Sequence, residues 1–469
     1  MKDRLDREHP EYRDQKQMWQ RYWDFYVGGE QLRRNASSYL VRRQKEPNDV
    51  YSERVSRVFY ENYLGSCIDW YGATLFRRQP RISVESAASR TNEFFSRFIE
   101  DCDQCGTSLL ETTRRAFIQA LVFRESYLLI DFPRVTDDTS SRAEEDAVGK
   151  SRAYLASFGP QDLTNWRTDA QGSYEWVVLR TEQTYQQSIE HNELVRKRRW
   201  AVYDRENFRI YEQTNLVASG DQSGSRAEND AVLVDEGRHG LAEARRVPLV
   251  KLSLTDGLWL GNKAALLQQE HFNKSNALSW ALHMGLFAMP VVYSDREWQQ
   301  IVGEAYYIQL GPNDRFGWTE PEGHVFQLAA DNLERLKDEI YRVCYLMTQA
   351  GGREARHLGQ SGDSKRRDFA VTHEILRAYG ALIKDLIRSV LRLVAQARRD
   401  EAEVEISGMD QFEVPDLPEE LESATRLREL GIPSKRLERE VQKRVALQYM
   451  DGMSQAAKSD VLREIEEDQ

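Results

Sequence analysis

The sequence DNLERLKDEIYRVCYLMTQAGGREARHLGQSGDSKRRD, residues 331–368, contains a helical pattern followed by a basic, glycine-rich segment. In residues 331–350 the apolar side chains recur at alternating intervals of three and four. This spacing predicts a helix with one apolar face that packs against a neighbouring helix. Gly351 and Gly352 predict its end. The members of the packing seam are Leu333, Leu336, Ile340, Val343 and Met347.

Residues 351–367, called the basic segment below, are predicted to form a loop in a chain that is otherwise acidic. One copy of such a loop would be a weak anion site, whereas a ring of copies would form a positive collar. A solvated surface loop with no partner is the competing interpretation of the same residues. The cationic side chains, with one histidine, are Arg353, Arg356, His357, Lys365, Arg366 and Arg367.

A second and longer helix is predicted over residues 368–400, where apolar residues recur at helical spacing. Gly380 interrupts the pattern and predicts a bend, since glycine within a helix costs about 1 kcal/mol relative to alanine. Residues 261–287 predict another long helix with a partly apolar face. Between this helix and the helix of residues 331–350, residues 288–330 combine short strands with a short helix.

The remaining segments predict a helix-rich α+β fold. Residues up to about 122 are mainly helical in pattern, and short aromatic or β-branched strands then dominate as far as residue 254. Polar stretches at 134–151 and 219–228 interrupt that strand-rich region. Short strands follow the second long helix, and the chain is helical and charged from Pro418 onward.

Composition limits the possible functions. The chain has 469 residues, with 65 Lys and Arg against 76 Asp and Glu, a net charge of −11. An acidic protein is not a general nucleic-acid coat, although one local basic feature can still contact DNA. No apolar run approaches the roughly 20 residues that cross a bilayer, so no membrane partner is expected. The charged N-terminus does not resemble a signal peptide, and four scattered cysteines favour a reducing cytoplasm.

No catalytic or metal-binding motif is evident. The glycine-rich run 359–365 lacks the Gly-Lys-Ser/Thr ending of a phosphate loop, and Cys102 and Cys105 form a Cys-x-x-Cys pair with no second pair in range. No cofactor is therefore expected. Catalytic groups need not be neighbours in sequence. A metal-dependent nuclease or phosphoryl-transfer enzyme with dispersed ligands, and a monomeric helical scaffold or adaptor, both remain alternatives.

The order of these segments resembles that of tailed-bacteriophage portal proteins, the head-to-tail connectors. The likeness covers about residues 15–450, and five local sequences carry it. They are EPNDVYSERVSRVFYENYLGSCIDWYGATLFRRQPRI (46–82), SFGPQDLTNWRTDAQGSYEWVVLRTEQTY (157–185), VPLVKLSL (247–254), NLERLKDEIYRVCYLMTQAG (332–351) and LRELGIPSKRLEREVQKR (427–444).

The resemblance implies a division of the chain into the parts of a portal-type ring subunit. The wing would hold helices and antiparallel strands, the stem two helices, and the clip a small α/β module; a long kinked backbone helix and a helical crown would follow. The implied boundaries are wing 1–254, first stem helix 255–287, clip 288–330, second stem helix 331–350, tunnel loop 351–367, backbone helix and strand return to the wing 368–416, and crown 417–469.

The resemblance also implies a function and a set of partners. Portal proteins are non-enzymatic rings of roughly twelve subunits, joined by heterologous contacts, at one vertex of the virion capsid. They are assembled in the host cytoplasm. The ring is the channel for packaging and ejecting double-stranded DNA, and it contacts major capsid and scaffolding proteins, the large terminase and head–tail adaptor or tail proteins. The basic segment would contact DNA, and the clip carboxylates Asp295, Glu297 and Glu304 would dock the terminase.

Overall fold

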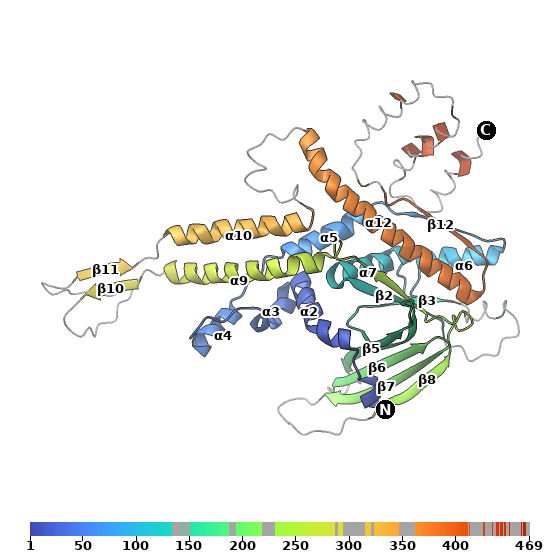
Figure 1. Ribbon diagram of the computed structural model, residues 1–469, viewed down its shortest axis with the longest axis horizontal. Coiled ribbons are helices and arrows are strands. Elements are labelled where there is room, and N and C mark those ends of the chain that lie inside the picture. Colours follow the sequence, from blue (N-terminus) through green and yellow to red (C-terminus); the bar gives the residue numbers. More distant parts are fainter. Residues whose placement is uncertain are drawn as a thin grey trace.

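The computed structural model places most of the chain in a helical body with two sheets, from which a pair of helices projects as a stalk (Figure 1). Helices and antiparallel sheets together confirm the predicted helix-rich α+β class. The residues that the structure describes are 1–133, 152–186, 194–217, 230–286, 289–293, 315–319, 323–346, 362–410, the single positions 144, 149 and 412, and isolated positions between 425 and 465.

The N-terminal helices form the larger part of the body's core. α2 begins at Pro10, which fits the first turn of a helix because its missing N–H would have no partner there. It ends at Gly28, whose φ of +64° favours glycine. The helices of this region are α1 (Lys2–Leu5), α2 (Pro10–Val27), α3 (Gly29–Arg34), η1 (Ala36–Ser38), α4 (Asn48–Ser56), α5 (Tyr63–Leu75), α6 (Ser89–Glu100) and α7 (Leu109–Phe123).

A buried carboxylate ties α2 to the chain that follows it. Asp24 is fully buried and lies where α2 approaches α3 and η1. Its two oxygens accept four hydrogen bonds, so the charge is satisfied by fixed donors. Burial and the contact with Asp24 both raise the pKa of the Tyr39 hydroxyl. The donors are Gln20 and Gln31 at 2.8 Å, Asn35 at 2.8 Å and Tyr39 at 2.6 Å.

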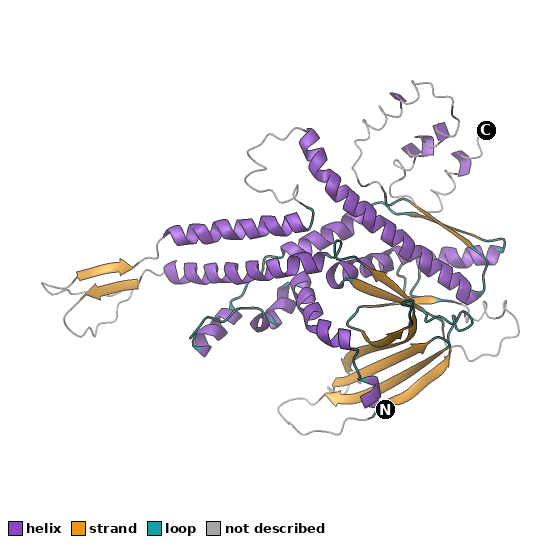
Figure 2. Cartoon of the chain, in the orientation of Figure 1, coloured by secondary structure: helices purple, strands orange, loops and turns teal. Residues whose placement is uncertain are grey.

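Among the described residues, four antiparallel sheets accompany these helices (Figure 2). A three-stranded sheet packs one face on α7 and the other on a five-stranded sheet, which buries Tyr127, Leu129 and Leu249 between the two sheets. The three-stranded sheet has the order β3 (Tyr154–Phe158), β2 (Glu125–Asp131), β9 (Leu249–Ser253). The five-stranded sheet has the order β4 (Leu163–Thr168), β5 (Tyr174–Gln186), β6 (Leu194–Asp204), β7 (Asn207–Val217), β8 (Val232–Arg238).

The stalk consists of two helices that pack along each other, α9 (Leu260–Leu286) and α10 (Gly323–Val343). At its tip β10 (Met289–Tyr293) pairs with β11 (Arg315–Thr319), as Figure 1 shows. α10 starts earlier than predicted, so residues 323–330 belong to the helix and not to the compact module. It also ends earlier, because Tyr345 has a φ of +60° that no α-helix accommodates.

The longest helix, α12 (Gly362–Arg398), crosses the body and shares its main core. One face buries Leu376, Tyr379, Ile383 and Val390 against the N-terminal helices. The chain then forms β12 (Glu403–Ser407), which pairs with β1 (Arg81–Glu85) in a two-stranded sheet. α12 begins six residues before the predicted start at 368, so residues 362–367 of the basic segment belong to the helix.

Candidate nucleic-acid interface

The structure divides the basic segment into two parts. Arg353, Arg356 and His357 lie outside the described residues, between α10 and α12. Lys365, Arg366 and Arg367 were predicted in a loop, and the structure instead places them in the first turns of α12. That prediction was wrong because a run of charged residues has no apolar periodicity to mark it as helical.

Three cations at the start of a helix concentrate positive charge. The backbone of a helix carries roughly half a positive elementary charge at its N-terminus, so cations there are disfavoured and anions are favoured. The same turns also hold Asp363 and Asp368, so residues 362–368 keep a net charge of +1. Together with the helix N-terminus, this charge makes the beginning of α12 an electropositive end to which a phosphate group is complementary.

This end of α12 extends beyond the body. Val371 is 56% exposed, whereas Thr372 is 2% exposed and is the first buried residue among the described side chains of the helix. The ten residues before Thr372, 362–371, make a projection of about 15 Å at 1.5 Å per residue. Figure 1 shows this end of α12 rising past α10 and away from the sheets.

The packing seam of α10 lies partly against α9 and the body. Leu336 and Ile340 are buried, and Leu333 and Val343 are half-buried. Met347 lies outside the described residues. Contact of this seam with another subunit stays a prediction, as does the terminase-docking role of Asp295, Glu297 and Glu304, which also lie outside the described residues.

Local ion pairs balance much of the stalk's surface charge. Lys274 pairs with Glu270 on α9, and on α10 a hydrogen bond from Arg342 lowers the pKa of the Glu339 carboxyl. Exposed pairs of this kind each stabilise a helix by only about 0.3–0.5 kcal/mol. Their effect on the electrostatic potential of the surface matters more than their effect on stability, because each paired group leaves little net charge to attract a polyanion.

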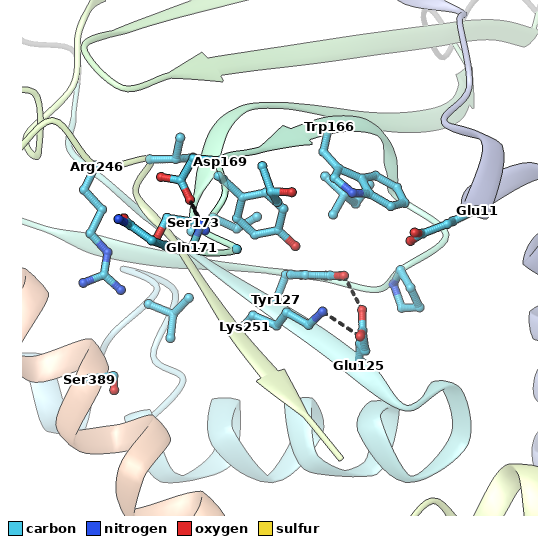
Figure 3. Close-up of a pocket in the computed structure, with 18 of the residues that line it drawn as sticks. Glu11, Glu125, Tyr127, Trp166, Asp169, Gln171, Ser173, Arg246, Lys251 and Ser389 are labelled. Carbon is cyan, nitrogen blue, oxygen red and sulfur yellow. Dashed lines mark hydrogen bonds and ion pairs between the residues drawn. The ribbon is translucent and has the colours of Figure 1, made fainter. Parts of the chain in front are cut away.

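A cavity of about 950 Å³ separates α2 from the edge of the two larger sheets (Figure 3). Glu125 on its floor contacts Lys251 at 2.6 Å and accepts a hydrogen bond from Tyr127 at 2.7 Å. Asp169 and Arg205 pair at 2.5 Å in its wall. Within the described residues no histidine or cysteine lines it. Glu125 and Asp169 are thus engaged by neighbours, and the described lining does not form a nucleophile–base pair of the His-activated type.

The Cys-x-x-Cys pair is split between the interior and the surface. Cys102 is buried, lies 3.2 Å from the Thr112 hydroxyl and has a pKa raised by burial to about 11. Cys105 is exposed. In the described part of the chain, no cluster of three or more His, Cys, Asp or Glu side chains is placed to hold a metal ion. No helix described here is long and apolar enough to cross a membrane.

Comparison with known proteins gives no family. No protein-family model matches the chain, and no curated protein matches it. Among solved structures, the neck of an empty gene transfer agent particle, computed with C6 symmetry, is similar with a TM-score of 0.42 and 14% identity; the match covers 90% of this chain and 99% of that one. The virion of a native gene transfer agent particle gives 0.40 and 14%, covering 88% and 97%. Both scores are below 0.5, so no functional conclusion is drawn from either likeness.

Proposed function

We propose that this protein is a non-enzymatic portal-type ring subunit whose assembled ring forms the channel for double-stranded DNA at one vertex of a virion. The observation that carries the proposal is the start of α12. There Lys365, Arg366 and Arg367 occupy the positive end of a helix that extends past the body end of the two-helix stalk. The rest of the basic segment adds Arg353 and Arg356 next to this end in sequence.

Repetition by symmetry turns this local charge into a DNA contact. A single basic end in a chain of net charge −11 binds DNA weakly. Roughly twelve copies around one axis would form a positive collar, and closed rings of this kind use heterologous interfaces. Contacts to phosphate carry no sequence information, so such a collar would hold any DNA sequence and let it slide.

Exposed apolar residues on the stalk favour the proposal that neighbouring subunits cover the stalk surface in the ring. Leu266 of α9 is 58% exposed, and Val325 and Leu328 of α10 are 60% and 56% exposed. Single exposed apolar residues are ordinary, but several on one helical pair favour a covered surface. In the ring each stalk would pack against the next, with the α10 seam contributing Leu333 and Val343.

The remaining parts take the roles of a portal subunit within this proposal. Residues 1–254 are the wing, residues 255–287 and α10 (Gly323–Val343) the stem, 288–322 the clip and 417–469 the crown. The clip, through Asp295, Glu297 and Glu304, would dock the large terminase during packaging and the adaptor or tail proteins afterwards.

Removal of the basic segment's charge tests the DNA contact. With Arg353, Arg356, Lys365, Arg366 and Arg367 changed to alanine, we expect rings to assemble and the yield of DNA-filled particles to fall about tenfold or more. The purified variant ring should also bind duplex DNA with a flatter dependence on salt, since each lost phosphate contact lowers the slope by about 0.9.

A matched variant removes five exposed arginines from the body and leaves the basic segment intact. It changes Arg33, Arg97, Arg115, Arg167 and Arg245 to alanine, each of which has a local acidic partner on the surface. This control should package DNA at close to the wild-type yield. If the basic-segment variant does so as well, the proposed DNA contact is wrong.

A further inference from the structure

The chain leaves α10 through a residue with an unfavourable backbone conformation. Tyr345 has a φ of +60°, in the left-handed region that a bulky side chain rarely adopts. Its neighbours Cys344 and Leu346 are buried. A residue persists in such a conformation only where its surroundings hold it there. The contacts of Tyr345 therefore show what fixes the end of α10.

Three separate helices hold this turn. The Lys263 ammonium of α9 lies 4.2 Å from the centre of the Tyr345 ring and donates to its hydroxyl oxygen. Tyr71 of α5 donates to the Cys344 carbonyl at 2.8 Å. Thr372 of α12 donates from its Oγ1 to the Tyr345 carbonyl at 2.5 Å. Because a cation over an aromatic face is attracted to it, the Lys263 contact adds to these hydrogen bonds.

The Thr372 bond joins two points on either side of the basic segment. Tyr345 precedes residues 346–371, and Thr372 follows them as the first buried residue of α12. Closing a long stretch of chain costs conformational entropy, which a bond at its base offsets. The same bond fixes the positions of Tyr345 and Thr372, the two residues that flank the stretch, relative to each other and to the body.

We infer that Tyr345, Lys263 and Thr372 form a clamp that positions the basic segment. The clamp residues touch no DNA themselves; they hold the two ends from which the cations of the segment extend. This role rests on the proposed DNA channel, because positioning matters only where the segment has something to contact. The clamp itself is a property of the folded chain and can be measured without DNA.

Thr372→Val removes the clamp's hydroxyl while keeping the shape of the side chain. Hydrogen exchange on the full chain should show the amides of residues 342–346 exchanging about 5–10-fold faster than in wild type. Thr372→Ser restores the hydroxyl and should restore slow exchange. Lys263→Met provides a second route, because it removes the cation from the Tyr345 ring and should accelerate exchange at the same amides.

Thr113→Val is the matched control. The Thr113 hydroxyl is also buried and also donates to a backbone carbonyl, that of Leu109 at 2.7 Å, but it lies within α7. Its loss should leave exchange at residues 342–346 unchanged. Unchanged exchange there in both Thr372→Val and Lys263→Met, or equal acceleration in Thr113→Val, would overturn the clamp.

The yield of DNA-filled particles tests the positioning role of the clamp separately from the proposed DNA channel. Thr372→Val should lower the yield of DNA-filled particles severalfold, and Thr113→Val should not. Faster exchange with normal packaging would overturn the positioning role and leave the channel proposal standing. Normal packaging after removal of the five cations would overturn the channel proposal and leave the clamp as a measured feature of the fold.

Discussion

Arg54→Met should lower the free energy of unfolding by about 3–5 kcal/mol, because it leaves a buried carboxylate without its counter-ion. The side chains of Arg54 and Glu46 are only 5% and 3% exposed and meet at 2.8 Å. The Arg43 amide also donates to Glu46 at 3.1 Å, but this neutral donor cannot replace the cation. Urea unfolding followed by tryptophan fluorescence measures the loss.

A change of pH distinguishes this mechanism from a packing defect. Burial alone would raise the pKa of Glu46, but the hydrogen bonds from Arg54 and the Arg43 amide outweigh it and lower the pKa. In wild type the group's contribution is complete above an unfolded pKa of about 4.3 and is lost as pH falls through the lower folded value. In Arg54→Met the hydrogen bonds from Arg54 no longer outweigh burial, so the pKa of Glu46 in the folded protein should rise. Protonation of Glu46 in acid then removes the buried charge and reduces the loss of stability. The difference in free energy of unfolding between wild type and Arg54→Met should therefore narrow from pH 7 to pH 4.

Two variants control for the loss of an arginine. Arg57→Met removes an exposed residue that pairs with Glu53 across one turn of the same region, and it should cost less than about 1 kcal/mol. The double variant with Arg54→Met and Glu46→Met removes both charges and should recover most of the lost stability. An equal loss in Arg57→Met, or no recovery in the double variant, would contradict a buried ion pair as the cause.

Gly380→Ala should destabilise the protein by about 3 kcal/mol, although alanine is the better helix former by about 1 kcal/mol. Gly380 lies in the buried face of α12, where the turn after β12 comes very close. A methyl group built on Gly380 would lie 2.1 Å from the Met409 carbonyl oxygen. That oxygen belongs to the backbone, so the helix or the turn must shift to make room. Urea unfolding again gives the magnitude.

Gly72→Ala in α5 is the matched helical control. A methyl group there would lie 3.2 Å from Cδ1 of Ile118, which is the flexible end of a side chain and can move aside. We expect a change within about 1 kcal/mol, since the better helix propensity of alanine offsets mild crowding. Equal losses in the two variants would show that backbone proximity at Met409 is not what requires glycine at position 380.

Local periodicity predicted that the long helices exist and which faces they bury, but not where they begin and end. The spacing of Leu336 and Ile340 predicted a packed face on the helix of residues 331–350, and both are buried in α10. The helix-rich α+β class follows from the same patterns and is confirmed. Gly380 was predicted to mark a bend, which stays a prediction, and the structure shows a close backbone contact there that was not foreseen. Spacing along one helix cannot reveal a neighbour that arrives from residue 409.

Features held by distant residues could not be predicted in this way. α10 ends at Val343, before the predicted end at residue 350, because Lys263 and Thr372 hold Tyr345 just beyond it in a left-handed conformation. The pairing of Glu46 with Arg54 likewise depends on how the chain before α4 folds back. The helical start of α12 was missed for another reason, since its charged residues carry no apolar pattern. The sequence shows the charges of Lys365, Arg366 and Arg367, but it does not show that they lie within a helix.

The central claim is that copies of this chain close into a ring around a DNA-sized hole. Native mass spectrometry of the purified protein, combined with negative-stain imaging, tests it most directly. The account predicts closed rings of roughly twelve subunits, with the start of α12 facing the axial opening. A protein that stays monomeric at every concentration, or rings that carry Lys365, Arg366 and Arg367 on their outer rim, would contradict it.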